Sequence, residues 1–306
     1  MQAATRSELF ELDIPVPDAQ LDDTCSTLIG FDERFARVGR SLQALLAPDS
    51  VAAWAAEFHD RDLPIASILA QRYPLVILEG DVGTGKTAFA ECAADRLARV
   101  TRRDGQLMKL STQVRGQGHV GQMSHLINQA FAAVEQEAGK KRLAFLVIDE
   151  ADSLGASREG DRSHHEDKVA VNTLIQKIDD ARRLGGRLLV FLCTNRPNAL
   201  DAALVRRAGG RERFERPGEV ERLELLRHDT RGLGISPEAV TRLAELTGPE
   251  QHDGLGFTFS DLRTRLLPEA VLRAYPDRPL TDDDLLETAA AMTPSPALVE
   301  ASATMP

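Results

Sequence analysis

Residues 80–87 read GDVGTGKT and fit the pattern G-x-x-x-x-G-K-[ST] at every fixed position. Four apolar residues, LVIL at 75–78, come directly before this octapeptide, as in a buried strand of a parallel sheet. A helical pattern follows it from Ala88 to Arg99. A strand, a glycine-rich loop and a helix in this order predict a phosphate-binding loop, or P-loop, rather than a glycine-rich turn that fits the pattern by chance.

The glycines of the P-loop predict a phosphate site at the start of a helix, because they let the backbone curl with its N–H groups pointing inward. Lys86 is expected to lie against the β- and γ-phosphates of ATP, and the Thr87 hydroxyl is expected to hold Mg²⁺. ATP and Mg²⁺ are therefore the expected cofactors. The loop residues expected to bind ATP are Asp81, Val82, Gly83, Thr84, Gly85, Lys86 and Thr87.

A second motif follows the apolar run Leu143–Ile148. Asp149 and Glu150 end this predicted strand, so both carboxylates emerge at the carboxyl edge of the sheet, where the P-loop also lies. Asp149 is expected to hold Mg²⁺ through water, and Glu150 to orient and polarise the attacking water. Asn195 ends the next strand, where its amide suits a hydrogen bond to the water or the γ-phosphate. The alternative for Asn195 is a plain turn residue before Pro197.

Composition excludes some classes of protein. Hydrophobic residues make up 42% and charged residues 27% of the chain, which is ordinary for a soluble protein. No apolar run approaches the roughly 20 residues of a membrane span, and the first residues lack the layout of a signal peptide, so we expect a cytoplasmic protein with no membrane partner. The net charge of −10 counts against broad nucleic-acid binding. Cys25, Cys92 and Cys193 have an odd count and no metal spacing, which favours reduced, mostly buried thiols.

Apolar periodicity divides the chain into four parts. Residues 1–26 hold Pro15, Pro17 and many acids, and they predict a mobile arm. Strands alternate with helices over 27–216, which predicts a large α/β ATPase domain, a three-layer fold with a parallel sheet. Strand signals vanish after that point, and 217–293 predict a small all-helical lid domain. The proline-containing residues 294–306 predict a disordered tail.

The apolar periodicity also predicts individual helices and strands. Trp54, on the second expected helix, is expected in the core. The expected strands are 75–78, 107–110, 143–148 and 188–192, and the expected helices of the large domain are about 31–46, 50–59, 88–99, 123–138 and 169–183. The expected lid helices are 220–230, 237–246, 260–274 and 282–292, with Ser236 and Thr281 as N-caps.

Arginines cluster after the last predicted strand of the large domain. Arg206 and Arg207 follow 198–205, and Arg211, Arg213 and Arg216 come soon after. Arginine stays charged and forks onto oxygens, which suits insertion into the phosphate site of a neighbouring subunit. The alternative for any one of them is a solvated basic face.

Together these motifs resemble an AAA+ ATPase over about residues 27–275. Leu28, Ile29 and Gly30 resemble the segment that packs on adenine in this superfamily, so Ile29 and Gly30 are implied as nucleotide contacts. GFTFSDLRTRLLPEA, at 256–270, resembles the lid helix whose start carries the second nucleotide sensor. Ser260 stands where that sensor is often arginine, and Arg263 after it is the candidate sensor.

The middle of the chain resembles the pachytene-checkpoint remodellers, which act on HORMA-domain proteins. The similar pieces are GQLMKLSTQ at 105–113, FLVIDEADSLGASRE at 145–159, AVNTLIQKID at 170–179 and ALVRRAG at 203–209. The resemblance implies a homo-hexameric ring in which Arg207 acts in trans. The short N-terminal part is similar to the bacterial members found with cyclic-oligonucleotide anti-phage systems, which unfold part of a HORMA protein and release it from its partner.

The pore loop of such unfolding ATPases follows the second strand and grips substrate with an aromatic and an apolar residue. By this resemblance the pair maps to His119 and Val120 within RGQGHVGQM, and the alternative is a plain glycine-rich connection. His164 and His165 lie in a polar stretch, 155–167, which is expected to be a loop. Adjacent histidines lack metal-ligand spacing on a helix.

Three functions fit these features. The first is an ATP-driven protein remodeller, and the second is a nucleic-acid-directed ATPase such as a clamp loader or a transposition accessory protein. The third is a nucleotide-dependent scaffold that hydrolyses slowly. The net charge and the lack of a basic and aromatic strip count against the second, and Glu150 counts against the third.

Overall fold

The computed structural model describes residues 5–59, 63–111, 122–139, 141–154 and 161–297. It divides into two compact units. The first comprises Met1–Glu79 and Thr87–Arg213, and the second comprises Gly80–Lys86 and Phe214–Pro306. Most of the P-loop thus belongs with the C-terminal helices. The domain boundaries expected from the sequence stay a prediction.

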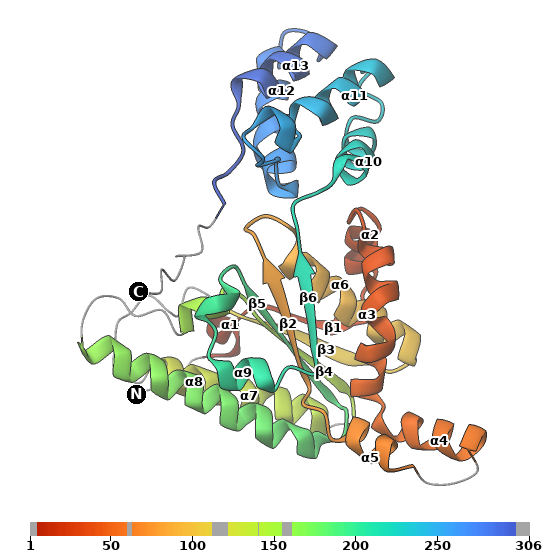
Figure 1. Cartoon of the computed structure of the whole chain (residues 1–306), viewed down its shortest axis with the longest axis vertical. Helices are drawn as coiled ribbons and strands as arrows, with labels where there is room; N and C mark the ends of the chain where they lie inside the picture. The colour runs from red at the N-terminus through yellow and green to blue at the C-terminus, as the bar shows by residue number, and fades with distance from the viewer. Residues whose placement is uncertain (1–4, 60–62, 112–121, 140, 155–160, 298–306) are drawn as a thin grey trace. The chain divides into compact units, whose positions relative to one another are not determined.

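A six-stranded sheet in the order β1-β3-β4-β5-β2-β6 forms the first unit (Figure 1). The four inner strands β3, β4, β5 and β2 pair in parallel, and β1 pairs antiparallel with β3. The α/β architecture expected from the sequence is therefore confirmed, with β1 as an antiparallel exception to the expected parallel sheet. The strands are β1 (Phe10–Val16), β2 (Leu75–Gly80), β3 (Gly105–Leu110), β4 (Leu143–Ile148), β5 (Leu188–Thr194) and β6 (Gly210–Phe214).

Helices cover both faces of this sheet (Figure 1). On one face, Phe131 of α7 (Gln122–Gly139) and Leu174 of α8 (Asp161–Ala181) share a core with Leu146 of β4. On the other face lie α6 (Lys86–Thr101) and α3 (Phe31–Leu46), where the rings of Phe31 and Phe89 are 5.5 Å apart. Every residue of β4 and β5 is buried, which explains their unbroken apolar sequence. Helix α8 begins within the stretch predicted as a loop, so that prediction is wrong from Asp161 on.

The N-terminal arm, predicted to be mobile, is instead part of the sheet. It forms α1 (Arg6–Leu9), β1 and α2 (Ala19–Ser26). Leu9 and Phe10 are buried, and Asp13 accepts a 2.6 Å hydrogen bond from Gln106 of β3. Because β1 is an edge strand, the missing N–H of Pro15 is tolerated there, which makes proline a poor sign of disorder in this segment.

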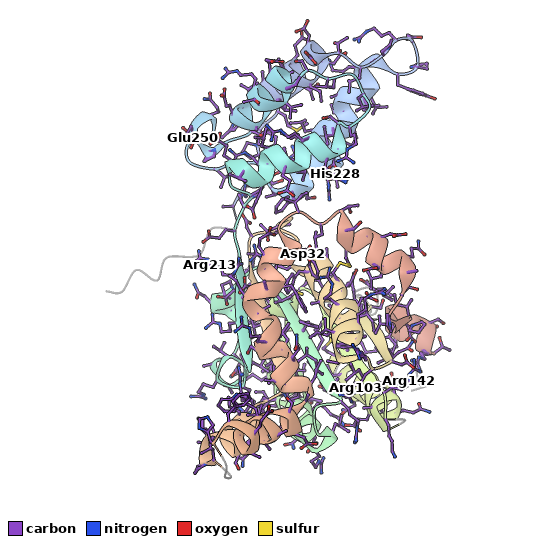
Figure 2. The ribbon with its side chains drawn as sticks, turned by 90° about the vertical axis from the view of Figure 1, so that its right-hand side faces the viewer. Asp32, Arg103, Arg142, Arg213, His228 and Glu250 are labelled. Atoms are coloured by element: carbon purple, nitrogen blue, oxygen red, sulfur yellow. A yellow bond between two sulfur atoms is a disulfide. The ribbon has the colours of Figure 1, made fainter. Side chains whose placement is uncertain are left out.

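A disulfide joins Cys25 of α2 to Cys92 of α6 and corrects the expectation of reduced thiols (Figure 2). The two Cα atoms are 5.5 Å apart, within the usual range for a disulfide. The partners are 67 residues apart in sequence, so no local spacing revealed the pair. The bond ties the N-terminal arm to the helix that follows the P-loop. Cys193 is buried and takes no part in it.

Helix α4 (Pro48–His59) also corrects an expectation, because Trp54 is 46% exposed and not in the core. Its ring lies 6.4 Å from that of Phe58 and 5.0 Å from that of His59, both on the same helix. Helix α5 (Pro64–Ala70) follows. The remaining short elements of this unit are η2 (Ala151–Leu154), η3 (Arg182–Leu184), η4 (Pro197–Ala199) and α9 (Ala202–Arg206).

The second unit is helical apart from its P-loop residues. Ser236 and Thr281 accept hydrogen bonds from the N–H groups of Ala239 and Asp284, which confirms both predicted N-caps. Figure 2 labels His228, which lies on the first helix of this unit, α10 (Glu219–Asp229). The other helices are α11 (Pro237–Leu246), η5 (Pro249–Gln251), the π-helical turn η6 (Asp261–Leu266), α12 (Leu267–Ala274) and α13 (Asp282–Ala291).

The chain remains ordered for several residues beyond α13. Ser295 lies in the tail predicted to be disordered, yet its N–H and hydroxyl donate to the carboxylate of Asp261 at 3.1 and 2.5 Å. These hydrogen bonds fix the start of that tail, and residues 298–306 lie outside the described residues. Over the ranges that the structure describes, no helix combines the length and the apolar character of a membrane span.

Candidate nucleotide site

The P-loop turns sharply at its glycines. Gly83 has a φ of +73°, and a Cβ there would come within 2.7 Å of the Ser260 Cβ. At Gly80, φ is +149° and a Cβ would come within 2.0 Å of the Phe214 carbonyl oxygen. Both positions therefore require glycine, for its backbone conformation and for lack of space. The result is a tight loop that leads into the N-terminus of α6 at Lys86.

Lys86 is 6% exposed and donates to the carbonyl oxygens of Gly80 and Asp81 at 3.1 and 2.6 Å. Thr84 also donates to the Asp81 carbonyl, at 2.8 Å, and the Asp81 carboxylate accepts from the N–H of Val82 at 2.8 Å. Asp81 thus accepts hydrogen bonds from three other residues of the loop. The ammonium group is held at the curl of the loop, where a phosphate chain would compete with the carbonyl oxygens for its protons.

Thr87 and Asp149 meet in the first unit. The Thr87 hydroxyl, in the first turn of α6, donates to Asp149 Oδ2 at 2.6 Å. A hydroxyl and a carboxylate oxygen at this spacing are the donors that Mg²⁺ prefers, so these two residues fit the ion. Among the described residues, no group of three or more His, Cys, Asp or Glu side chains is placed to hold a metal.

Glu150 has a left-handed backbone, with a φ of +48°. This conformation is uncommon outside glycine and costs on the order of 1 kcal/mol. The Glu150 N–H donates to Asp149 Oδ1 at 2.8 Å, and its side chain is exposed. An unfavourable backbone held in place directly after the carboxylate that is expected to hold Mg²⁺ marks Glu150 as a functional candidate.

Asp152 links the ends of β4 and β5, a role that the sequence reasoning missed. Its Oδ1 accepts from the Thr194 hydroxyl at 3.1 Å and from the Asn195 N–H at 3.3 Å. Ile148 and Leu192 are neighbours in the ladder, so Asp149, Glu150 and Asn195 come together at one edge of the sheet. Asp152 closes the FLVIDEAD stretch, and its position after two carboxylates was the available signal.

Ile29 and Gly30 lie in the first unit, at the start of α3. Gly30 is the N-cap of that helix with a φ of +73°, and its carbonyl accepts from the Arg34 N–H at 3.2 Å. Ile29 is half-buried. The pair forms a fixed turn at a helix start, and its contact with adenine stays a prediction.

The candidate sensor Arg263 forms a fork on Asp229 of α10, at 2.6 and 3.0 Å. Burial works against the charge of Asp229, but hydrogen bonds from Arg263 and His228 hold the pKa of that carboxyl below its usual value. Arg216, which was expected only as part of a basic cluster, donates to the carboxylate of Asp81 at 2.7 Å. Within the described part of the second unit, the arginine in contact with the P-loop carboxylate is thus Arg216.

The paired arginines differ in environment. Arg207 donates to both carboxylate oxygens of Asp179 on α8, at 2.6 and 3.0 Å, and its guanidinium lies 5.6 Å from the centre of the Tyr73 ring. The hydrogen bonds to Asp179 raise the pKa of Arg207. Arg206, one residue earlier, is exposed. The predicted pore residues His119 and Val120 lie outside the described residues.

Comparison with protein families matches residues 76–216 to the ATPase family associated with various cellular activities (AAA). This span runs from the second residue of β2 to the second residue after β6 and includes the P-loop, Asp149, Glu150 and Asn195. Known proteins match over nearly the whole chain. The CD-NTase-associated protein 6 of Escherichia coli strain KTE188 is 48% identical over 96% of this chain and 99% of its own. The protein of that name from strain MS 115-1 is 40% identical over 96% and 97%.

Solved structures agree with these matches. A chain from the structure of the E. coli MS115-1 HORMA:CdnC:Trip13 complex has 39% identity and a TM-score of 0.87 over 97% of this chain and 99% of its own. Rhizobiales Trip13 has 34% identity and a TM-score of 0.70 over 94% and 100%. The FIGL-1 AAA domain in complex with ADP, at 21% identity and a TM-score of 0.62, shares the fold.

Proposed function

The chain belongs to the AAA ATPase family as a close homologue of CD-NTase-associated protein 6, and from this premise we propose that it is an ATP-driven remodeller of a HORMA-type protein. One observation carries the ATPase part of the proposal, namely the 2.6 Å contact between Thr87 and Asp149 beside the strained backbone of Glu150. The remodelling part is supported by the full-length likeness to a chain solved in complex with HORMA and CdnC. The setting is CD-NTase anti-phage signalling.

Each site residue has a role in ATP hydrolysis. The P-loop N–H groups and Lys86 bind the phosphates, and Thr87 and Asp149 would hold Mg²⁺, which would supply positive charge to the phosphates and the leaving ADP. Glu150 orients a water and takes its proton as the water oxygen attacks the γ-phosphorus. The bond from that phosphorus to the bridging oxygen breaks, which releases ADP and phosphate. Asn195 donates a hydrogen bond to the water or the γ-phosphate.

We infer a homo-hexameric ring, in which Arg207 acts on ATP bound to the neighbouring subunit. Arginine suits this role because its planar fork and permanent charge match phosphate oxygens. Arg263 is the candidate lid sensor, and Ile29 and Gly30 are the candidate adenine contacts. His119 and Val120 are the proposed grip on the substrate in the ring pore.

The test reconstitutes the reaction with a HORMA protein bound to its CD-NTase partner. The wild-type chain is expected to hydrolyse ATP, to be stimulated by the complex, and to release the HORMA protein from it. Glu150→Gln should capture the complex in the presence of ATP without releasing it. Double-stranded DNA serves as the competing stimulus. Stimulation by DNA together with failure to release the HORMA protein would contradict the proposal and favour a nucleic-acid-directed ATPase.

A further inference from the structure

The guanidinium of Arg216 contacts three segments that are far apart in the sequence. Its Nε and Nη2 atoms contact Asp81 Oδ2 in the P-loop at 2.7 and 2.6 Å. Its Nη1 donates to the Gly256 carbonyl at 2.6 Å, and its Nη2 donates to the Ser295 carbonyl at 2.8 Å. The side chains of Arg216 and Asp81 are 12% and 18% exposed. Partly buried, charge-assisted bonds of this kind are stronger than surface ion pairs.

The last of these segments, residues 292–297, is named here the C-terminal strap. Ser295 is its anchor, because its carbonyl accepts from Arg216 while its N–H and hydroxyl donate to Asp261 at 3.1 and 2.5 Å. The Asp261 side chain is 1% exposed and also accepts from Arg265 at 2.6 Å. A buried carboxylate needs such donors, so the strap completes the hydrogen bonding of Asp261.

Asp261 in turn fixes the turn that contacts the P-loop. The Thr258 N–H donates to Asp261 Oδ2 and the Asp261 N–H donates to Thr258 Oγ1, both at 3.0 Å. Within this turn, the Ser260 N–H donates to the Gly83 carbonyl at 3.1 Å. The strap therefore acts on the P-loop along two routes, through Arg216 to Asp81 and through Asp261 and Ser260 to Gly83.

We propose that the C-terminal strap and Arg216 are positioning elements of the nucleotide site, which hold P-loop residues 81–83 in the conformation that binds phosphate. The proposal rests on the proposed function, in that the P-loop binds ATP. Arg216 acts through Asp81 and touches no phosphate itself. Nucleotide affinity is thereby made to depend on residues that follow α13.

Two truncations of the full chain test this arrangement. Ending the chain at Thr293 removes Ser295, and ending it at Ala297 keeps Ser295 and every contact described above. Affinity for fluorescently labelled ADP is measured at a temperature well below the unfolding midpoint of each variant. The Thr293 truncation should bind about 10-fold or more weakly than the full chain, corresponding to about 1.4 kcal/mol. The Ala297 truncation should bind like the full chain.

If the chain that ends at Thr293 folds poorly, point variants test the positioning role instead. Arg216→Gln should raise KM for ATP several-fold with a smaller change in kcat, because the loop is displaced and the reacting groups are kept. Arg216→Lys, which keeps the charge toward Asp81 and loses the fork, should recover part of that loss. Arg216→Gln and Asp81→Asn should be far from additive in ADP affinity, since each breaks the same ion pair.

A purely structural role predicts a lower unfolding midpoint for Arg216→Gln with unchanged ADP affinity of the folded protein, and that result would overturn the proposal. Equal affinity of both truncations and the full chain would also overturn it. In both cases the wild-type protein still binds ADP, so the proposed function survives. Failure of the wild-type protein to bind any nucleotide would instead overturn the proposed function, and the positioning role with it.

Discussion

Arg207 and Asp179 form a two-pronged ion pair, with donor–acceptor distances of 2.6 and 3.0 Å, that joins the end of α9 to α8. If Arg207 acts on ATP of a neighbouring subunit, as proposed, its guanidinium must first exchange Asp179 for phosphate. The two side chains are 24% and 32% exposed, so water reaches and partly screens the pair. Arg206 is the exposed neighbour that needs no exchange. We therefore expect different effects from substituting the two arginines.

Arg207→Ala should bind ATP and lose hydrolysis by on the order of 10³-fold, the usual effect of removing a trans arginine. Mixing it with Lys86→Ala should partly restore activity, because one interface can then combine an intact P-loop with an intact arginine. Asp179→Asn should retain activity, since it releases Arg207. Arg206→Ala is the matched control and should have a smaller effect. Steady-state ATPase rates and light scattering of the mixed rings provide the measurements.

Failure to recover activity at any mixing ratio, with mixed rings verified, would count against action in trans by Arg207. Loss of hydrolysis in Arg206→Ala with an active Arg207→Ala would assign the role to Arg206. In that case the pair with Asp179 is a structural tie between α9 and α8.

Glu150→Gln should bind ATP and lose turnover by at least about 10²-fold, because a carboxamide cannot accept the proton of the attacking water. Lys86, Thr87 and Asp149 are unchanged in this variant, so the proposed binding of phosphate and Mg²⁺ should persist. Turnover close to that of the wild type would remove Glu150 from its role as base.

Glu150→Gly should also lose turnover, but it should raise the unfolding free energy by on the order of 1 kcal/mol, because glycine relieves the left-handed φ of +48°. Calorimetry of the two variants side by side checks this. If Glu150→Gly raises the unfolding free energy and Glu150→Gln does not, the strain lies in the backbone at position 150.

Both edge strands were missed by the sequence reasoning, while all four inner strands were predicted. Inner strands such as β4 are buried on both faces and read as continuous apolar runs. An edge strand has a free side and carries charge or proline as protection against aggregation, so β6 reads GRERF and β1 contains Pro15. Burial of the edge strands depends on tertiary pairing that no local period records.

The site likewise contains residues that the sequence predicted and contacts that it did not. Thr87, Asp149 and Glu150 were predicted from their motifs, because the chemistry of phosphate fixes residue type and spacing there. The contact of Arg216 with Asp81 spans 135 residues and has no motif, so only the folded chain brings it into view. The Cys25–Cys92 disulfide escaped the sequence for the same reason.

That disulfide leads to a stability prediction. Closing a loop of 67 residues removes unfolded-state entropy worth roughly 4 kcal/mol in the chain-entropy description. Reduction should therefore lower the unfolding midpoint, and Cys25→Ser should lower it equally and become insensitive to reductant. Cys193→Ser serves as the control for thiol effects elsewhere. Equal midpoints with and without reductant in the wild type would show that the bond contributes nothing in solution.

The pKa of Asp261, which binds the C-terminal strap, predicts how the stability of the fold depends on pH. Burial works against its charge, but donors from Ser295, Thr258 and Arg265 lower the pKa of its carboxyl to about 2, from 3.8. A depressed pKa stabilises the fold above the unfolded-state value and loses that contribution as the pH falls from about 4 toward 2. The shift corresponds to about 2 kcal/mol. Asp261→Asn should thus be destabilised at pH 7, and its difference from the wild type should shrink at pH 3. Asp277→Asn, at an exposed position, is the control.

The last prediction concerns force on the substrate. His119 and Val120, which lie outside the described residues, are the imidazole and the branched apolar group of RGQGHVGQM, at 115–123, that the predicted pore loop can offer to a peptide. Both are far in sequence from Lys86 and Glu150, so grip and hydrolysis should separate. The double variant His119→Ala/Val120→Ala should keep basal ATPase activity and ring assembly, and should lose both stimulation by a HORMA protein and its release. The decisive measurement pairs the ATPase rate with release from the complex, using Gln117→Ala in the same loop as control. Normal release by the double variant would make this loop an ordinary connection and place the grip elsewhere on the chain.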